Sequence, residues 1–220
     1  MLQPPLSSVE VRILGALAEK ALTTPDNYPL SLSALTAACN QTTSREPVMQ
    51  LDEETVTQHV VSLRRRNLLR AIQPAGSRVT KYQHLLTEAL DLDARDIGVL
   101  GVLMLRGAQT VGELHTRTAR LAEFADSAAV EGTLDGLIAR QPQALVTRLP
   151  RRPGQKEVRF AHLLGGDVAA LEEAAAPRAP APNAEHEPDR VSALGRTVEE
   201  LRAEVAALRA QFVAFREQFQ

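Results

Sequence analysis

The sequence predicts a mainly α protein built from two copies of one unit, each with three helices followed by a β-hairpin. Ser7 and Glu10 form a capping-box pattern at the start of the first helix, and Asp93 and Asp96 repeat it 86 residues later. A Leu-Gly pair follows in both helices at the same offset, and both units end in His-Leu-Leu. These matches indicate an internal duplication.

The other two helices of each unit follow the same plan. Short second helices are expected near residues 32–39 and 111–118. The third helices are expected to start at the N-caps Asp52 and Asp126, which are 74 residues apart. Their apolar faces are Val56, Val60 and Leu63 in the first unit and Val130, Leu134 and Leu137 in the second.

Strand-like alternation around a turn closes each unit. The segments are LLRAIQ and RVTKYQH in the first unit and ALVTRL and KEVRFAH in the second. Asn67 is expected to end the third helix before the first of these strands. Three helices followed by a two-stranded hairpin, or wing, is the winged-helix arrangement. We therefore predict tandem winged-helix domains over residues 6–90 and 91–165.

The remaining residues predict a linker and a coiled-coil helix. Residues 166–190 are rich in Ala, Pro and Glu and have no apolar periodicity. Residues 191–220 carry apolar side chains at alternating spacings of three and four, with three phenylalanines at the end of the seam. The sequence predicts a homodimer formed by this seam, chiefly through Val191, Leu194, Val198, Leu201, Val205 and Leu208.

Composition argues against several classes of function. Aromatic residues make up only 3 % of the 220 residues and tryptophan is absent, which disfavours an aromatic-lined ligand pocket. The single cysteine, Cys39, is expected to be a small buried side chain. We found no phosphate-binding loop, nucleophile elbow or paired metal-ligand histidines. The sequence therefore predicts a non-enzymatic, cytoplasmic protein with no cofactor, no metal and no membrane segment.

The segment TTPDNYPLSLSALTAACNQTTSREPVMQLDEETV, residues 23–56, resembles the YceH family of bacterial proteins of unknown function. The wing segment GSRVTKYQH and the Leu-Gly repeat resemble that family as well, and the similarity covers residues 6–165. The resemblance implies tandem winged-helix domains and no established catalytic activity. It leaves the function open, because a fold does not determine a function.

Double-stranded DNA is the first expected partner, and the protein would act as a DNA-binding or transcription-regulatory dimer. Cationic side chains would contact phosphates, and Gln58 and Arg65 could read base edges. The candidate contacts are Gln58, Arg65, Arg66, Arg70, Arg78 and Lys81 in the first unit and Arg151, Arg152 and Lys156 in the second.

A protein–protein interaction scaffold is the alternative. The net charge is −2 with a pI near 6.2, which is not typical of a nucleic-acid-binding domain. The third helix of the first unit also begins with Asp52, Glu53 and Glu54, where a recognition helix normally approaches DNA most closely. The third helix of the second unit is even less suited to contact the base edges of DNA.

The first unit has 12 additional residues between its first and third helices, because the repeat offset falls from 86 to 74. They lie in TTPDNYPLS, in NQTTSREPVMQ, or in both. Long ordered loops are often functional, so we predict a partner-binding surface anchored by Tyr28 and Arg45. The alternative is that the loops brace the domain, with Arg45 paired to an acid at the start of the third helix.

Overall fold

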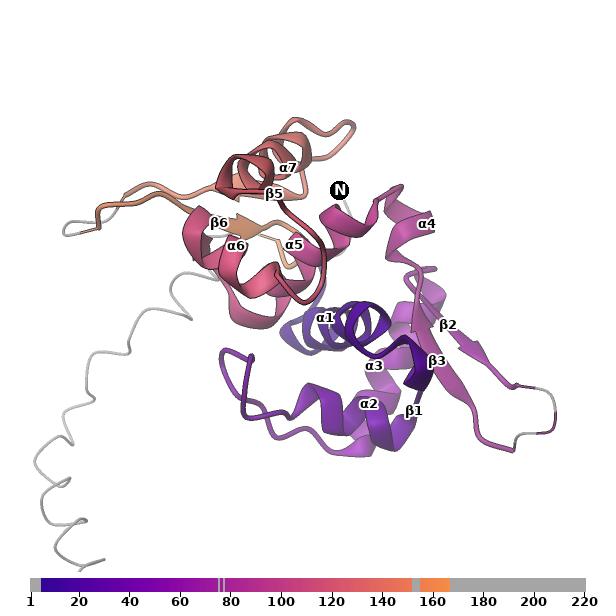
Figure 1. The fold of residues 1–220 in the computed structure, drawn as a ribbon. Helices are drawn as coiled ribbons and strands as arrows, with labels where there is room; N and C mark the ends of the chain where they lie inside the picture. Colours follow the sequence, from indigo (N-terminus) through magenta and orange to yellow (C-terminus); the bar gives the residue numbers. More distant parts are fainter. Residues whose placement is uncertain (1–4, 75, 77, 152–154, 167–220) are drawn as a thin grey trace, which may run out of the picture. The chain divides into compact units, whose positions relative to one another are not determined.

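The computed structural model describes residues 5–74, 76, 78–151 and 155–166 (Figure 1). All of them lie in one compact unit of the chain, residues 1–173. Within them, helices predominate and the strands form two small antiparallel sheets, so the mainly α class with hairpins is confirmed. Residues 167–190 of the predicted linker and the whole predicted coiled-coil segment fall outside the described residues. The four predicted domain ranges stay predictions.

The first half contains three main helices and a three-stranded sheet. Its elements are α1 (Ser8–Thr23), the 3-10 helix η1 (Pro25–Asn27), β1 (Leu30–Ser31), α2 (Leu32–Cys39), α3 (Glu53–Arg65), β2 (Leu69–Ile72) and β3 (Lys81–His84). The strand order is β1-β3-β2. In Figure 1 the β2–β3 hairpin projects away from the helices, and α4 (Leu86–Leu90) leads into the second half.

The second half repeats this order and topology. Its elements are α5 (Ala94–Arg106), β4 (Gln109–Thr110), α6 (Val111–Thr118), α7 (Ser127–Ala139), β5 (Val146–Arg148) and β6 (Arg159–His162). The strand order β4-β6-β5 matches that of the first sheet. The expected helices and hairpin strands therefore lie where the sequence predicted them. The third strand of each sheet was not predicted, because a two-residue strand is too short to show alternation.

Side-chain caps start the main helices at the predicted residues. Ser7 and Glu10 form a capping box on α1, and Asp93 and Asp96 form one on α5. Asp52 accepts a hydrogen bond from the Thr55 amide at 2.7 Å and so caps α3. These bonds satisfy amide groups that would otherwise have no partner in the first helical turn.

The caps of the second helices locate the 12 additional residues of the first half. Ser31 caps α2 and Thr110 caps α6, an offset of 79 residues. The first-helix caps are 86 apart, and the third-helix caps 74 apart. The differences, 86 − 79 and 79 − 74, place seven additional residues before α2 and five between α2 and α3. The insertion is therefore shared between the two segments.

The two halves pack against each other through α1 and α5, at the repeated Leu-Gly pair. A Cβ on Gly15 would lie 3.0 Å from Met104 Cβ, and a Cβ on Gly101 would lie 3.9 Å from Ala18 Cβ. Ala18 and Met104 are themselves 86 residues apart, so the same faces of the two helices meet in an approximately two-fold arrangement.

The contact between α1 and α5 produces one continuous core. Every residue of α1 from Glu10 to Glu19 is buried, and so is α5 from Ile97 to Leu105. The predicted apolar faces of α3 and α7 join the same cluster. The first half is also tied to the end of the second by a hydrogen bond from the Leu6 amide to the Leu164 carbonyl, 2.9 Å long.

We expect Gly15→Ala to destabilise the protein and Gly101→Ala not to. At Gly15 the new methyl group must displace Leu105 or Met104, and overpacking costs about 1–3 kcal/mol. At Gly101 the contact is ordinary, and the gain in helix propensity is up to about 1 kcal/mol. Thermal unfolding of the two variants measures the difference. Equal melting temperatures would contradict the tighter contact at Gly15.

Candidate nucleic-acid interface and the inserted loops

The third helix of the first half places Gln58 and Arg65 on its exposed face. Val56, Val60 and Leu63 are buried on the opposite face, as predicted. Asn67, at φ 55°, ends the helix and turns the chain into β2. The left-handed conformation at this position suits an asparagine better than most residues. Gln58 and Arg65 can therefore reach a ligand that approaches α3 from solvent.

The β2–β3 hairpin adds three cationic side chains to this half. Arg70 pairs with Gln83 and Ile72 pairs with Lys81 in the strand register, so Arg70 and Lys81 project from the same face of the hairpin. Arg78 is exposed in the turn between the strands. In the part of the chain that the structure describes, no ion pair involves Arg65 or any of these three side chains.

Arg66 differs from its neighbours because it faces the interior. Its Nη1 lies 3.6 Å from Oε2 of Glu10, which completes the capping box of α1. The other oxygen of Glu10 accepts a hydrogen bond from the Ser62 hydroxyl at 2.6 Å. Ser62 is accordingly half-buried. Arg66 and Ser62 thus attach α3 to α1, and a phosphate contact by Arg66 would have to compete with Glu10.

The acidic and basic side chains of α3 lie at opposite ends of the helix. Asp52, Glu53 and Glu54 are exposed at its start, and Arg64 and Arg65 at its end. The hydrogen bond from the Thr55 amide lowers the pKa of the fully exposed Asp52 carboxyl. A nucleic acid would therefore meet repulsion at the start of α3 and attraction at its end and at the hairpin.

The second half has no equivalent exposed cationic face on its third helix, α7, which the structure describes in full. Arg148 of β5 donates to Asp135 of α7 at 2.6 Å, lies 3.9 Å from Glu131, and stacks over Phe160 at 5.6 Å. Arg151 and Lys156 are exposed and line a hollow of about 460 Å³ beside the starts of α6 and α7. Arg152, the remaining predicted contact, lies outside the described residues.

The inserted loops contain both predicted partner-binding anchors, and both make internal contacts. The Tyr28 hydroxyl accepts a hydrogen bond from the His84 amide at 2.7 Å, and burial raises the pKa of Tyr28. Tyr28 is half-buried, whereas Arg45 is only 6 % exposed. Their role in partner binding stays a prediction, and these contacts favour the bracing alternative.

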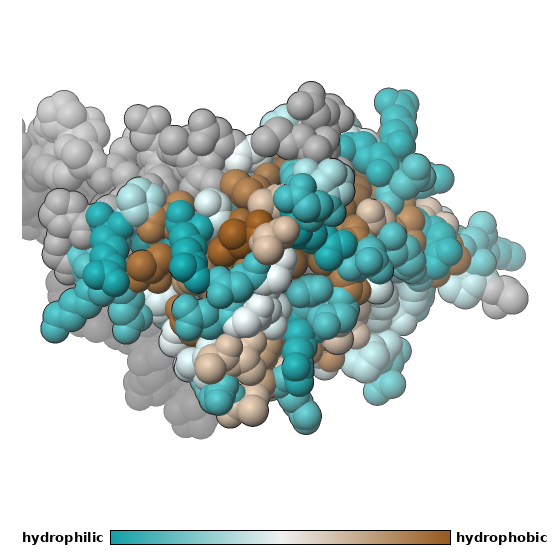
Figure 2. Space-filling view, turned by 90° about the horizontal axis from the view of Figure 1, so that it is seen from above, coloured by the Kyte–Doolittle hydropathy of each residue, from teal (hydrophilic) through white to brown (hydrophobic). Residues whose placement is uncertain are grey.

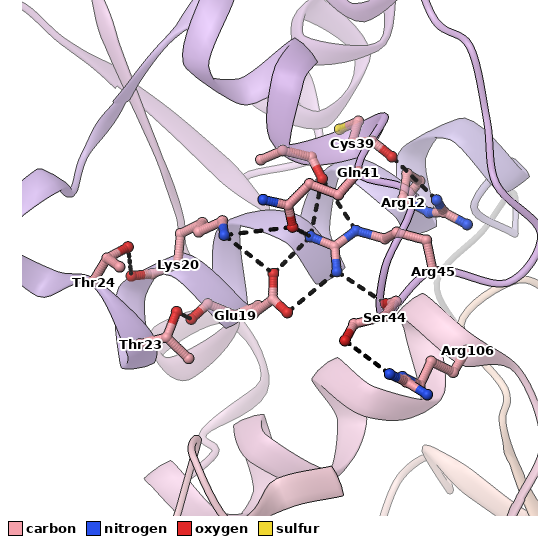
Figure 3. Close-up of polar contacts among 11 residues, drawn as sticks. Arg12, Glu19, Lys20, Thr23, Thr24, Cys39, Gln41, Ser44, Arg45 and Arg106 are labelled. Carbon is pink, nitrogen blue, oxygen red and sulfur yellow. Dashed lines mark hydrogen bonds and ion pairs between the residues drawn. The ribbon is translucent and has the colours of Figure 1, made fainter.

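The guanidinium group of Arg45 is surrounded by acceptors (Figure 3). It pairs with both carboxylate oxygens of Glu19 in α1, at 2.6 and 3.2 Å, and also bonds the Ala38 carbonyl and the Gln41 side chain. The expected pairing with an acid at the start of α3 was wrong. Those acids are exposed and solvated, whereas Glu19 is buried and gains more from a cationic partner.

Arg12 anchors the same loop from the same face of α1, two helical turns before Glu19. It is 1 % exposed and donates to the Cys39 carbonyl at 3.1 Å and the Pro47 carbonyl at 2.6 Å. Asn40 closes the base of the loop through two hydrogen bonds with the backbone of Leu51, 2.7 and 2.8 Å long. The loop between α2 and α3 is therefore an ordered part of the fold.

This loop also contacts the second half. The Glu46 amide donates to the Leu105 carbonyl at 2.8 Å, and Arg106 donates to the Ser44 hydroxyl at 2.8 Å. Sequence reasoning missed Arg12, Glu19 and Arg106. A usable signal was present for the first two, because they are charged residues at the two ends of the apolar run from Ile13 to Ala18.

Metal binding, thiol chemistry and membrane insertion were not expected from the sequence. Among the described residues, no group of three or more His, Cys, Asp or Glu side chains is placed to hold a metal ion. Cys39 is a buried free thiol, and burial raises its pKa to about 12. No helix in the described ranges combines the length and apolar character needed to cross a bilayer.

Comparison with known proteins identifies the family. A family model described as a protein of unknown function, DUF480, matches residues 6–155. A UPF0502 protein of Opitutus terrae is 51 % identical over 177 residues, 80 % of this chain and 77 % of the relative. A UPF0502 protein of Geobacter sulfurreducens is 48 % identical, over 98 % of this chain and 98 % of the relative. A UPF0502 protein of an Enterobacter is 42 % identical, over 92 % of this chain and 95 % of the relative.

The chain is therefore a member of a bacterial family of proteins of unknown function. It belongs to the DUF480 family, the UPF0502 or YceH proteins, and the resemblance seen in the sequence is confirmed.

Arg45→Met should lower the free energy of unfolding by about 3–5 kcal/mol, because it leaves the Glu19 carboxylate buried without its main partner. The exposed Arg64→Met serves as control and should change stability by less than about 0.5 kcal/mol. Chemical denaturation measures both. A second substitution, Glu19→Gln, should recover part of the loss in the Arg45→Met background. An Arg45→Met variant as stable as the wild type would instead favour a recognition role.

Stability should decline below pH 6.5 because of His162. Burial lowers the pKa of His162 from 6.5 to about 4, so the folded protein keeps this ring neutral while the unfolded chain takes up a proton. The stabilising contribution is complete above pH 6.5 and is lost as the pH falls towards 4, at up to about 1.4 kcal/mol per pH unit. His162→Leu should flatten the profile between about pH 7 and pH 5. An unchanged slope would assign the effect to other groups.

Proposed function

We propose that the chain is a non-enzymatic tandem winged-helix protein that binds double-stranded DNA through the first half. The end of α3 and the β2–β3 hairpin form the binding surface. One observation supports this most strongly: Arg65, Arg70, Arg78 and Lys81 are cations without an ion-pair partner among the described residues. Such side chains neutralise phosphates at little cost, because no internal pair has to be broken.

The topology supports the winged-helix assignment. Each half has the order helix, strand, helix, helix, hairpin, and in each sheet the short first strand pairs with the last strand of the hairpin. In this fold the third helix and the wing face the same ligand. Here those four cations lie on the exposed face of α3 and on the hairpin. The seam of residues 191–220 would join two such chains into a homodimer.

The separation of charge on α3 shapes this proposal. The acidic start of α3 argues against full insertion of its amino-terminal end into a major groove. Contact by Arg65 and the hairpin would instead be made largely with phosphates, and Gln58 is the side chain best placed on α3 to touch a base edge. Affinity would then depend strongly on salt and weakly on DNA sequence.

A protein–protein scaffold is the second candidate. Val61 on the exposed face of α3 and Val48 in the loop before it are 39 % and 50 % exposed, which suits a protein partner better than a phosphate backbone. The face drawn in Figure 2 carries mostly hydrophilic side chains, with hydrophobic ones in separate areas. With these two exposed valines, a scaffold would bind through small apolar contacts on the first half.

Removing the four cations should weaken DNA binding and its salt dependence. We expect the combined variant Arg65→Ala, Arg70→Ala, Arg78→Ala and Lys81→Ala to reduce the slope of log affinity against log salt. The slope should fall by about 0.9 for each phosphate that the variant no longer neutralises. Titration of a random-sequence duplex across a salt series, followed by fluorescence anisotropy, measures the slope.

The matched control is Arg151→Ala with Lys156→Ala in the second hairpin, which should change the slope less. An equal or larger effect of the control would move the interface to the second half. A wild-type protein that does not bind duplex DNA at low salt would overturn the proposal in favour of the scaffold.

A further inference from the structure

A pocket of about 220 Å³ lies where the inserted loop meets the second half. Its charged side chains are Glu19 of α1, Arg106 of α5, Arg117 of α6 and Arg120 beyond α6, and Thr23 of α1 and Ser44 of the loop also line it. The walls thus come from both halves and from the loop between α2 and α3, which is five residues longer than its counterpart in the second half. This pocket is separate from the cationic face of α3.

The charge of the lining is positive. Arg106, Arg117 and Arg120 face a single carboxylate, Glu19, which is already bonded to Arg45 and lies 3.7 Å from Lys20. Arg117 pairs with Glu113 at 3.2 Å, but both side chains are partly exposed and such helical pairs are weak. Arg120 forms no ion pair with any described residue. The guanidinium groups are therefore available to an added anion.

Arg106 is fixed in place by the inserted loop. Its Nη2 donates to the Ser44 hydroxyl at 2.8 Å, which holds the side chain beneath the loop (Figure 3). Burial lowers the pKa of Arg106, the positive charge of Arg117 lowers it further, and the carboxylates of Glu19 and Glu46 act in the opposite direction. Two like charges held close to each other favour a bound anion, because the anion removes their mutual repulsion.

The size of the pocket limits the anion. Pockets for drug-sized ligands usually measure about 300–1,000 Å³, so this one suits a smaller group. Guanidinium groups match the oxygens of phosphate in pairs, and three of them exceed what a single carboxylate needs. We propose that this pocket binds the phosphate group of a small molecule, with Arg106, Arg117 and Arg120 as its ligands.

The proposal gives the inserted loop a role beyond bracing. Ser44 lies in the loop that has five additional residues between α2 and α3, and its hydroxyl and carbonyl accept hydrogen bonds from different partners, Arg106 and Arg45. The three proposed ligands belong to the second half, whereas Thr23 and Ser44 of the first half line the same pocket, so a bound phosphate would lie between the two halves. Binding should therefore stabilise the packing of the halves against each other by mass action.

Isothermal titration of the full chain with inorganic phosphate and with pyrophosphate tests the proposal, with sodium chloride at equal ionic strength as reference. We expect saturable binding of one or both anions. Arg117→Ala and Arg120→Ala should each weaken it about tenfold or more, since each removes a charge-assisted hydrogen bond. The control Arg64→Ala removes an exposed arginine outside the pocket and should leave the dissociation constant unchanged.

Thermal unfolding without phosphate identifies any variant that fails for lack of stability, and Arg117→Lys and Arg120→Lys then replace the alanine variants. Absence of saturable binding to the wild type would overturn the proposal, and so would unchanged binding in both pocket variants. Duplex DNA binding that requires Arg117 and Arg120 while neither free anion binds would also overturn it, because these arginines would then contact a nucleic-acid backbone.

Discussion

The burial of α1 between the rest of the first half and α5 is the constraint on which the structure depends. A helix buried on all sides cannot leave a charged side chain in water, yet α1 carries Glu10, Arg12 and Glu19. Each unpaired charge in that position would cost several kcal/mol. The surrounding elements supply the partners: α3 contributes Ser62 and Arg66 to Glu10, and the inserted loop contributes Arg45 to Glu19 and carbonyl groups to Arg12.

The buried charges of α1 thus explain why the loop between α2 and α3 is longer. The second half lacks the additional residues because the buried part of α5 carries no charged side chain. At the 86-residue offset, Arg12 corresponds to Gly98 and Glu19 to Leu105. The buried part of α5 is apolar from Ile97 to Leu105, so no guanidinium or carboxylate there needs a partner. The second half can therefore join α6 to α7 with a shorter connection. The loop and the two charges of α1 form one structural feature, although they lie far apart in the sequence.

Local signals made most of the fold predictable. Ser7, Asp52, Asp93 and Asp126 mark helix starts by a mechanism that involves only the next three residues, and periodicity assigned the buried faces of α3 and α7. The side-chain contacts of the candidate site were harder to predict from the sequence. Nothing in the spacing of Arg45 distinguishes Glu19 from Glu53 as its partner, because the choice depends on burial and on how the loop returns to α1. Likewise Arg66 and Arg65 are adjacent arginines, and only the packing of α3 on α1 separates the internal one from the exposed one.

The duplication also explains why the two third helices present different surfaces despite a shared topology. At the 74-residue offset, Glu131 and Asp135 of α7 correspond to Thr57 and Val61 of α3, and the strand pairing makes Arg148 of β5 the counterpart of Ala71 in β2. The ion pair that joins helix and wing in the second half therefore has no counterpart at these positions of the first. Loss or gain of this interaction changes the three positions 131, 135 and 148 together. The arginine without the carboxylates, or the carboxylates without the arginine, would have no partner of opposite charge there. Among the described residues of the first half, no ion pair joins the exposed face of α3 to the hairpin, and an unobstructed helix face is what binding to any external partner requires.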